Sequence, residues 1–301
     1  MKIDEKELFV DFKGFKTYVK IANPNGKNAP LILLHGGPGS THNSMELIEP
    51  VALLSDRPLI YYDQIGCGLS SKPDSQKDEI YNQDFWIDEL ENLIETLHIE
   101  KYHLLGHSWG GMLAQLFVLK KKPHNILSLT LSSTLSSAKL WKEETHGLIK
   151  KMSKEDQEII RIAEANNDYT TPFFLDVASR YMKLTVSNYS LDDPNLPECL
   201  SRNKVRGDVA YLTAWGPSEF APTGNLKDYE TTPYLENIKV PTLVCYGSLD
   251  ESTKKQNELM YESLGSNKKK ILVFQNARHM TYYERNEEYI KEINDWLVTN
   301  D

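Results

Sequence analysis

The chain is poor in cysteine, with three among 301 residues. A small odd number provides no disulfide framework and is typical of proteins in a reducing compartment. Basic residues are also in the minority, since 34 lysines and arginines face 43 acidic residues and leave a formal net charge of −9. The basic runs, such as residues 120–122 and 268–270, are short and indicate solvated surface. We therefore expect no nucleic-acid partner, which would need a clustered basic face.

Long apolar runs are missing as well. No stretch approaches the roughly 20 residues of a membrane-spanning helix, and residues 1–10 are charged and lack the apolar segment of a signal peptide. These absences predict a cytoplasmic protein with no membrane span, and they leave peripheral association with the cell envelope open. The sequence has no H-E-x-x-H motif and no paired cysteines, so we expect neither a metal nor another cofactor. No pattern in the sequence indicates an oligomeric state.

Short continuous apolar runs are present instead, and they indicate strands buried on both faces, as in a parallel sheet. The runs are APLILLHGG, RPLIYYDQIG, KYHLLGHS, LSLTLSST, VPTLVCYGSLD and KKILVFQNARHM. Residues 82–99 lie between the second and third runs and carry apolar residues at helical spacing. Residues 6–22 alternate around a turn at Lys13 and Gly14, which predicts a hairpin. Strands that alternate with helices predict an α/β fold.

The strand pattern is interrupted after about residue 134. Residues 136–230 contain amphipathic helical segments and no buried-strand run, and the strand pattern then returns. An insert of about 95 residues is too long for an ordinary loop. The sequence therefore predicts an α/β core formed by residues 1–135 and 231–301, with a mostly helical cap subdomain at residues 136–230.

The stretch GHSWG places Ser108 between Gly106 and Gly110, after a predicted strand and before a predicted helix. This is the context of a G-x-S-x-G nucleophile elbow, in which a tight turn exposes the serine hydroxyl above the sheet. The turn crowds the positions two before and two after the serine, and glycine relieves that crowding. A chance match to the five-residue string is the alternative, and the strand and helix around it make the elbow the better interpretation.

A serine needs a base to become a good nucleophile. Asp250 follows one late predicted strand and His279 follows the next, in the order expected after a nucleophile elbow. Both positions lie at the carboxyl ends of strands, where open α/β sheets bind ligands. Taken alone, Asp250 reads more simply as a turn or helix-capping residue, and His279 as a surface loop residue. Their joint placement predicts a Ser108–Asp250–His279 triad.

An acyl-transfer site also needs N–H groups for the oxyanion. Trp109 directly follows the predicted nucleophile and offers one of them. The loop in LILLHGGPGS follows an early strand, and its glycines let the backbone approach a ligand closely. We expect Gly37 of this loop to provide the second N–H group; an ordinary glycine-rich turn is the alternative.

Together these elements resemble the proline iminopeptidases, serine peptidases of the α/β-hydrolase fold. The resemblance rests on HGGPGS at 35–40, YYDQIGCGLSS at 61–71, GHSWGG at 106–111 and the placement of Asp250 and His279. It runs from about residue 5 to the C-terminus, and it is greatest to the lactobacillus-type enzymes and the related archaeal tricorn-interacting aminopeptidase. It implies a mostly parallel central sheet flanked by helices, with a helical cap inserted late in the core. The motif that contains Asp63 and Gln64 is interpreted as shaping the loop beside the site.

The resemblance also implies a site for the substrate's amino group. In the family, a glutamate in a G-x-x-E-[FY] stretch of the cap binds this group, which corresponds to Glu219 in GPSEF, and a second acid follows the catalytic aspartate, here Glu251. An α-amino group is largely cationic at neutral pH, so two carboxylates would pair with it. An exposed acid on a solvated face is the alternative for either glutamate taken alone.

The predicted activity is that of a serine exopeptidase that releases an N-terminal residue, preferably proline, from short peptides through an acyl-enzyme. The preference for proline and the peptide partners come from the resemblance. Tyr211, Trp215, Phe220 and Trp109 are candidates for an apolar pocket wall, with plain packing as the alternative. An amino-acid amidase or esterase with the same triad and amine sensor is the rival function. A non-catalytic binding protein on the same fold is the rival from another class, and such proteins usually lose a member of the triad.

Overall fold

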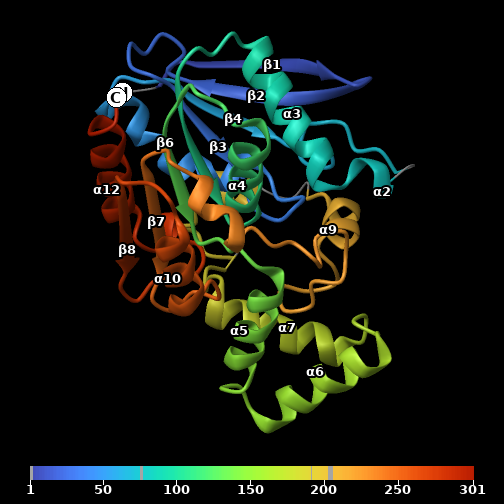
Figure 1. Ribbon diagram of the computed structural model, residues 1–301. Coiled ribbons are helices and arrows are strands. Elements are labelled where there is room, and N and C mark those ends of the chain that lie inside the picture. Colours follow the sequence, from blue (N-terminus) through green and yellow to red (C-terminus); the bar gives the residue numbers. More distant parts are fainter. Residues whose placement is uncertain (1–2, 75–76, 191, 203–205) are drawn as a thin grey trace.

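The computed structural model describes residues 3–74, 77–190, 192–202 and 206–301. Its centre is one eight-stranded sheet with the order β1-β2-β4-β3-β5-β6-β7-β8 (Figure 1). Only the β1–β2 and β2–β4 pairs are antiparallel, and the other strands run parallel. The strands are β1 (Glu5–Phe12), β2 (Phe15–Ala22), β3 (Leu31–Leu34), β4 (Leu59–Asp63), β5 (Tyr102–His107), β6 (Ile126–Ser132), β7 (Thr242–Gly247) and β8 (Lys269–Phe274). The expected hairpin and all six expected strands are confirmed. Burial on both faces holds for five of the six, whereas β8 lies at the edge of the sheet and is only partly buried.

The central strands are continuously apolar because each side chain enters one of two cores. In β3, Leu31 and Leu33 pack in one core while Ile32 and Leu34 pack in the other, as the two-residue period of a strand requires. All four side chains are buried. A parallel sheet covered on both faces therefore has no polar alternation in its central strands.

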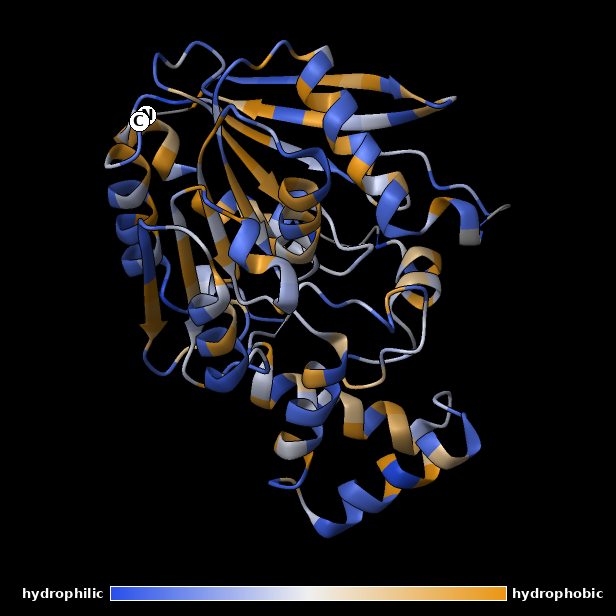
Figure 2. Ribbon diagram, viewed as in Figure 1, coloured by the Kyte–Doolittle hydropathy of each residue, from blue (hydrophilic) through white to orange (hydrophobic). Residues whose placement is uncertain are grey.

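Helices cover both faces of the sheet. Residues of α3, α4 and α10 join the first core, and residues of η1, α1 and α12 join the second. The hydropathy colouring shows that the central strands are apolar and that the helices around them carry mixed apolar and polar positions (Figure 2). The bounds of the helices around the sheet are η1 (His42–Ile48), α1 (Pro50–Leu54), α2 (Lys77–Ile80), α3 (Gln83–Thr96), α4 (Trp109–Lys121), η2 (Thr232–Asn237), α10 (Lys254–Ser263), α11 (Thr281–Glu284) and α12 (Asn286–Val298).

Helices α5 to α9 separate β6 from β7, and α5 to α7 project beyond the carboxyl ends of the parallel strands (Figure 1). Ser137 and Glu230 form an antiparallel bridge, so the two ends of the inserted segment meet beside the sheet. The proposed cap subdomain, residues 136–230, contains all five helices. They are α5 (Ala138–Ile149), α6 (Lys154–Asn166), α7 (Pro172–Thr185), α8 (Glu198–Arg202) and α9 (Asp208–Ala214).

None of the helices in the described part of the chain has the length and apolar character needed to cross a membrane.

A buried ion pair joins two distant parts of the core. The Arg57 side chain is fully buried, and its guanidinium donates to both carboxylate oxygens of Asp301 at 2.9 and 3.2 Å. The same carboxylate lies 3.1 Å from Nε2 of His103. Ser55 Oγ and the Ala29 carbonyl accept the remaining bonds of Arg57, so the pair closes a satisfied polar cluster.

Replacing Asp301 with alanine is expected to lower the free energy of unfolding by about 2 kcal/mol, because it leaves a buried guanidinium without its counter-charge. The cost is below that of a fully buried pair because the Asp301 side chain is 30% exposed. Chemical denaturation measures the change. The matched control is Asp295→Ala, which removes an exposed pair with Lys291 and should cost less than about 0.5 kcal/mol. Equal losses in the two variants would contradict the prediction.

Candidate active site

Ser108 lies in a strained turn between β5 and α4. Its φ is 55° and its ψ is −124°, a combination that an ordinary residue avoids. A Cβ at Gly106 would lie 2.2 Å from the Gly110 carbonyl oxygen, and a Cβ at Gly110 would lie 2.0 Å from that of Leu34. The expected crowding at these two glycines is confirmed, and it allows the serine to stand at the carboxyl end of β5.

The glycine loop after β3 comes close to this serine. A Cβ at Gly36 would lie 3.0 Å from Cβ of Ser108, so a larger residue would press on the serine. Gly37 has a φ of 112°, in the region that favours glycine, and lines the same pocket as Ser108. Trp109 is the first residue of α4, so its N–H belongs to the free N-terminal turn of that helix.

Gln64 connects the glycine loop to the helix behind Ser108. Its side-chain oxygen accepts a 2.7 Å hydrogen bond from Nε1 of Trp109, and its amide donates to the His35 carbonyl at 3.3 Å. The Gln64 backbone N–H also donates to Nε2 of His35 at 3.1 Å. The buried Gln64 thus fixes the position of His35, the residue before Gly36, relative to Trp109. This geometry agrees with a loop-shaping role for the motif around Asp63.

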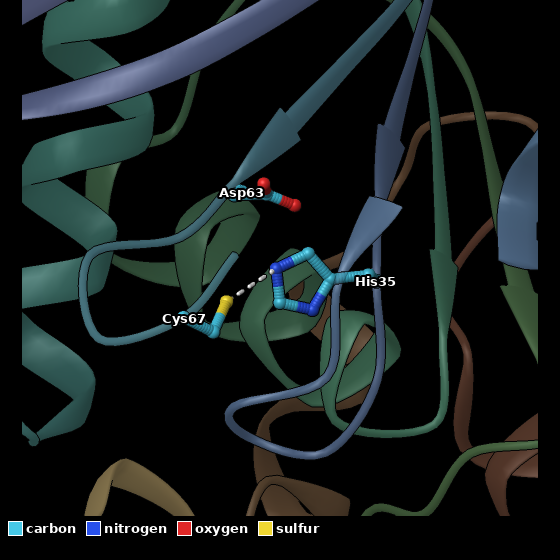
Figure 3. A group of neighbouring side chains, drawn as sticks. All are labelled: His35, Asp63 and Cys67. Atoms are coloured by element: carbon cyan, nitrogen blue, oxygen red, sulfur yellow. Dashed lines mark hydrogen bonds between the residues drawn. The ribbon is translucent and has the colours of Figure 1, made fainter. Parts of the chain in front are cut away.

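His35, Asp63 and Cys67 form a buried cluster beneath this loop (Figure 3). It is the one group of three potential metal ligands among the described ranges. The donor atoms are already engaged: the Asp63 carboxylate accepts from His42 and from the Leu69 N–H, and Cys67 Sγ contacts the Gln64 carbonyl at 3.2 Å. Burial lowers the pKa of His35 to about 4 and raises the pKa of the Cys67 thiol. These contacts fit a structural cluster, since a cation would have to displace each of them.

His279 and Asp250 meet at the carboxyl ends of β8 and β7. Nδ1 of His279 lies 2.8 Å from Oδ1 of Asp250, and both side chains are buried. Burial alone would lower the pKa of His279, but Asp250, followed by Glu251 and Glu219, raises it to about 9. His279 and Ser108 line one pocket of about 330 Å³, so the structure brings the three residues that the sequence singled out to the same edge of the sheet.

His107 also contacts this histidine, which sequence reasoning did not anticipate. The rings of His107 and His279 have centroids 4.8 Å apart, and Tyr282 lies edge-on to His107 at the same distance. Burial, and then the neighbouring His279, lowers the pKa of His107. Trp141 of α5 is a second ring neighbour of His279, with ring centroids 6.2 Å apart. In the sequence, the only sign that His107 lies near the site is its position directly before Ser108. The contacts of Tyr282 and Trp141 join residues far apart in the sequence, so spacing could not reveal them.

The segment that carries His279 is bonded to the end of α7. The His279 N–H donates to the Thr185 carbonyl, and the Met280 N–H donates to the Val186 carbonyl, each at 3.0 Å. The rings of Tyr189 and Tyr283 pack edge to face across the same junction. The histidine loop is therefore connected by its backbone to the inserted helices as well as to the sheet.

Two acidic side chains enter the same pocket. Glu251 is fully buried, and neither of its carboxylate oxygens has a hydrogen-bond partner among the described residues. The Tyr181 hydroxyl lies near enough to interact electrostatically, but the geometry falls short of a hydrogen bond. Burial and then the nearby Glu219 raise the pKa of Glu251. Glu219 itself accepts a 2.9 Å bond from the Tyr211 hydroxyl.

The aromatic residues near Glu219 mainly hold its backbone. The indole N–H groups of Trp141 and Trp215 donate to the Glu219 carbonyl at 2.7 and 3.3 Å. Phe220 packs in the small apolar cluster of the inserted helices. Of the candidates for an apolar pocket wall, Phe220 is therefore a packing residue, and Trp215 helps to position the backbone of Glu219.

This chain is similar to known proteins in both sequence and structure. Residues 29–286 match the family model for the alpha/beta hydrolase fold. A proline iminopeptidase of Lactobacillus acidophilus is 43% identical over 96% of this chain and 97% of that protein. Another from Clostridioides difficile is 44% identical over 100% of both. The crystal structure of a proline iminopeptidase from Mycobacterium smegmatis superimposes with a TM-score of 0.86 at 28% identity, covering 98% of each chain.

Proposed function

The chain belongs to the proline iminopeptidase family of the α/β hydrolases, and from that membership we propose that it is a serine exopeptidase that removes N-terminal proline from short peptides. In this proposal Ser108 attacks the carbonyl of the first residue while His279 takes its proton. Asp250 accepts the Nδ1–H of His279 across 2.8 Å and so fixes the tautomer that leaves Nε2 free to act as the base. His279 then protonates the leaving amine, and water hydrolyses the acyl-enzyme.

The oxyanion of the tetrahedral intermediate would be bound by the N–H groups of Gly37 and Trp109. Trp109 supplies a free N–H together with the positive end of the α4 dipole. Gly37 lines the pocket with Ser108, in the loop whose Gly36 packs against the serine. The Gln64 link fixes the two donors relative to each other before substrate arrives, which is what electrostatic preorganisation requires.

The observation that carries the proposal is the unpaired buried carboxylate of Glu251. Burying a charge without a partner is unfavourable, and the raised pKa of Glu251 reflects that cost. A substrate ammonium group placed between Glu251 and Glu219 would supply a cationic partner and favour the charged form of Glu251. An internal peptide unit carries no such cation, so this arrangement selects substrates by their free amino end.

The acids and the serine line one pocket of about 330 Å³. This shared lining supports a substrate whose amino group and scissile carbonyl belong to the same residue. The preference for proline follows from membership in the family. Free short peptides are the proposed substrates, and we propose a cytoplasmic location for the reaction, in line with the sequence.

The purified protein should hydrolyse proline anilide at least about 100-fold faster than N-acetylproline anilide, because acetylation removes the charge that the acids bind. Initial rates at matched concentrations measure the ratio. Proline amide and a proline dipeptide in the same panel separate a peptidase from an amidase by their relative kcat/KM. Equal rates for the free and the acetylated anilides would rule out recognition of the amino group.

A further inference from the structure

The pocket that holds Ser108 carries positive charge at its mouth as well as negative charge in its interior. Among its lining residues within the described ranges, Lys183 and Arg206 are the only lysine and arginine. Both are exposed, whereas Glu251 is fully buried in the same pocket. The two acids thus lie in the pocket together with the buried His279, whereas the lysine and the arginine lie where the pocket meets solvent.

These two cations have no ion-pair or hydrogen-bond partner among the described residues, although their neighbours do. Arg180, three residues before Lys183, pairs with Asp156 and Asp176. Arg202, four residues before Arg206, pairs with Glu46 and Glu198. The paired arginines join elements of the fold, so the unpaired side chains are the ones left available for a ligand.

The two unpaired cations come from different elements and reach the same pocket. Lys183 lies in the last turn of α7, and Arg206 precedes Gly207, the N-cap residue of α9. Arg206 is close enough to the Tyr211 phenol to affect it electrostatically, and that phenol bonds Glu219. The cations therefore lie within reach of a molecule whose amino end is bound by the acids.

A peptide of two or three residues is a zwitterion, and its ends match this distribution of charge. Consecutive Cα atoms are about 3.8 Å apart, so a carboxylate that follows the scissile bond by one or two residues emerges near the mouth. The molecule has a net charge of −9 and the pocket interior is acidic, so an incoming carboxylate would be repelled without local cations. We propose that Lys183 and Arg206 form a subsite for the free α-carboxylate of a di- or tripeptide, which rests on the aminopeptidase function proposed above.

The experiment compares Pro-Ala with Pro-Ala amide, by following release of free proline, in the wild type and in Lys183→Met, Arg206→Met and the double variant. The wild type should have the higher kcat/KM for the free acid. Each single substitution should reduce the acid-to-amide ratio by about two- to fivefold, as expected for an exposed ion pair, and the double variant should bring the ratio close to one. Rising salt concentration should reduce the ratio in the wild type.

Proline anilide has no carboxylate and serves as the internal control, since its hydrolysis should be the same in all four proteins. Lys150→Met removes an exposed lysine at the end of α5, outside the pocket, and should leave the acid-to-amide ratio unchanged. The subsite is overturned if the wild type does not prefer the free acid, or if the double variant keeps the wild-type ratio. Failure of the wild type to hydrolyse proline anilide would instead overturn the proposed function.

Discussion

Replacing Ser108 with alanine is expected to lower kcat for proline anilide by about 10⁴–10⁶ and to leave the fold unchanged. The hydroxyl is the proposed nucleophile, and it lies in the tight turn between β5 and α4, on the pocket that His279 also lines. The fold should survive because the backbone holds the turn: the Ser108 N–H donates to the Ser132 carbonyl, and the Ser108 carbonyl accepts from Thr134 Oγ1. Steady-state kinetics and thermal unfolding measure the two effects.

Ser133 offers a matched control for this experiment. It is a buried serine with a φ of 47° at the end of the neighbouring strand, and its hydroxyl has no partner among the described residues. Ser133→Ala should keep its activity. A fluorophosphonate should label the wild type and Ser133→Ala but not Ser108→Ala. Labelling of Ser108→Ala, or retained anilide hydrolysis by it, would show that a different residue is the nucleophile.

Replacing Glu251 or Glu219 with glutamine is expected to lower kcat/KM for proline anilide by about 10- to 100-fold each. The substitution keeps the size of the side chain and removes the charge that would bind the substrate ammonium. Rates for N-acetylproline anilide should change much less, so the ratio of free to acetylated substrate falls. Glu144→Gln removes a carboxylate that pairs with Lys255 outside the pocket and should leave this ratio unchanged.

The pH dependence of kcat/KM in the Glu251 and Glu219 variants provides a second measurement. A purely structural defect would lower kcat/KM without shifting this pH dependence. Glu251 and Glu219 both raise the pKa of His279, the proposed base, and an imidazole can accept a proton only when it is neutral. Removing either negative charge lowers that pKa, so the ascending limb of kcat/KM should shift to lower pH. An unshifted limb together with an unchanged substrate ratio would exclude these acids from the site.

The sheet and the serine turn could be predicted because their causes are local. A strand buried on both faces must be continuously apolar, as β3 is, and the turn at Ser108 tolerates only glycine at positions 106 and 110. The short helices η1 and α1, between β3 and β4, were not predicted. They have seven and five residues, which is too few for a helical period to stand out.

The surroundings of the site could not be predicted from spacing, because they depend on folding. His107, Trp141 and Tyr282 come from three separate elements and meet around His279 and its neighbours. A surface cation such as Arg206 belongs to no periodic pattern, so its arrival at the pocket mouth is visible only in three dimensions. The sequence singled out Asp250 and His279 as triad members only as a pair. Taken alone, Asp250 reads as a turn or capping residue and His279 as a surface loop residue.

The two backbone bonds between the end of α7 and the His279 segment limit how this enzyme can be re-engineered. A chimera that exchanges the inserted helices for those of another hydrolase must reproduce the carbonyls of residues 185 and 186 in place. Otherwise the N–H groups of His279, the proposed base, and of Met280 lose their acceptors, and the imidazole loses its support. The inserted helices and the His279 segment therefore have to be changed together. Directed evolution of the inserted helices should keep the last turn of α7 and vary α5 and α6, which precede it.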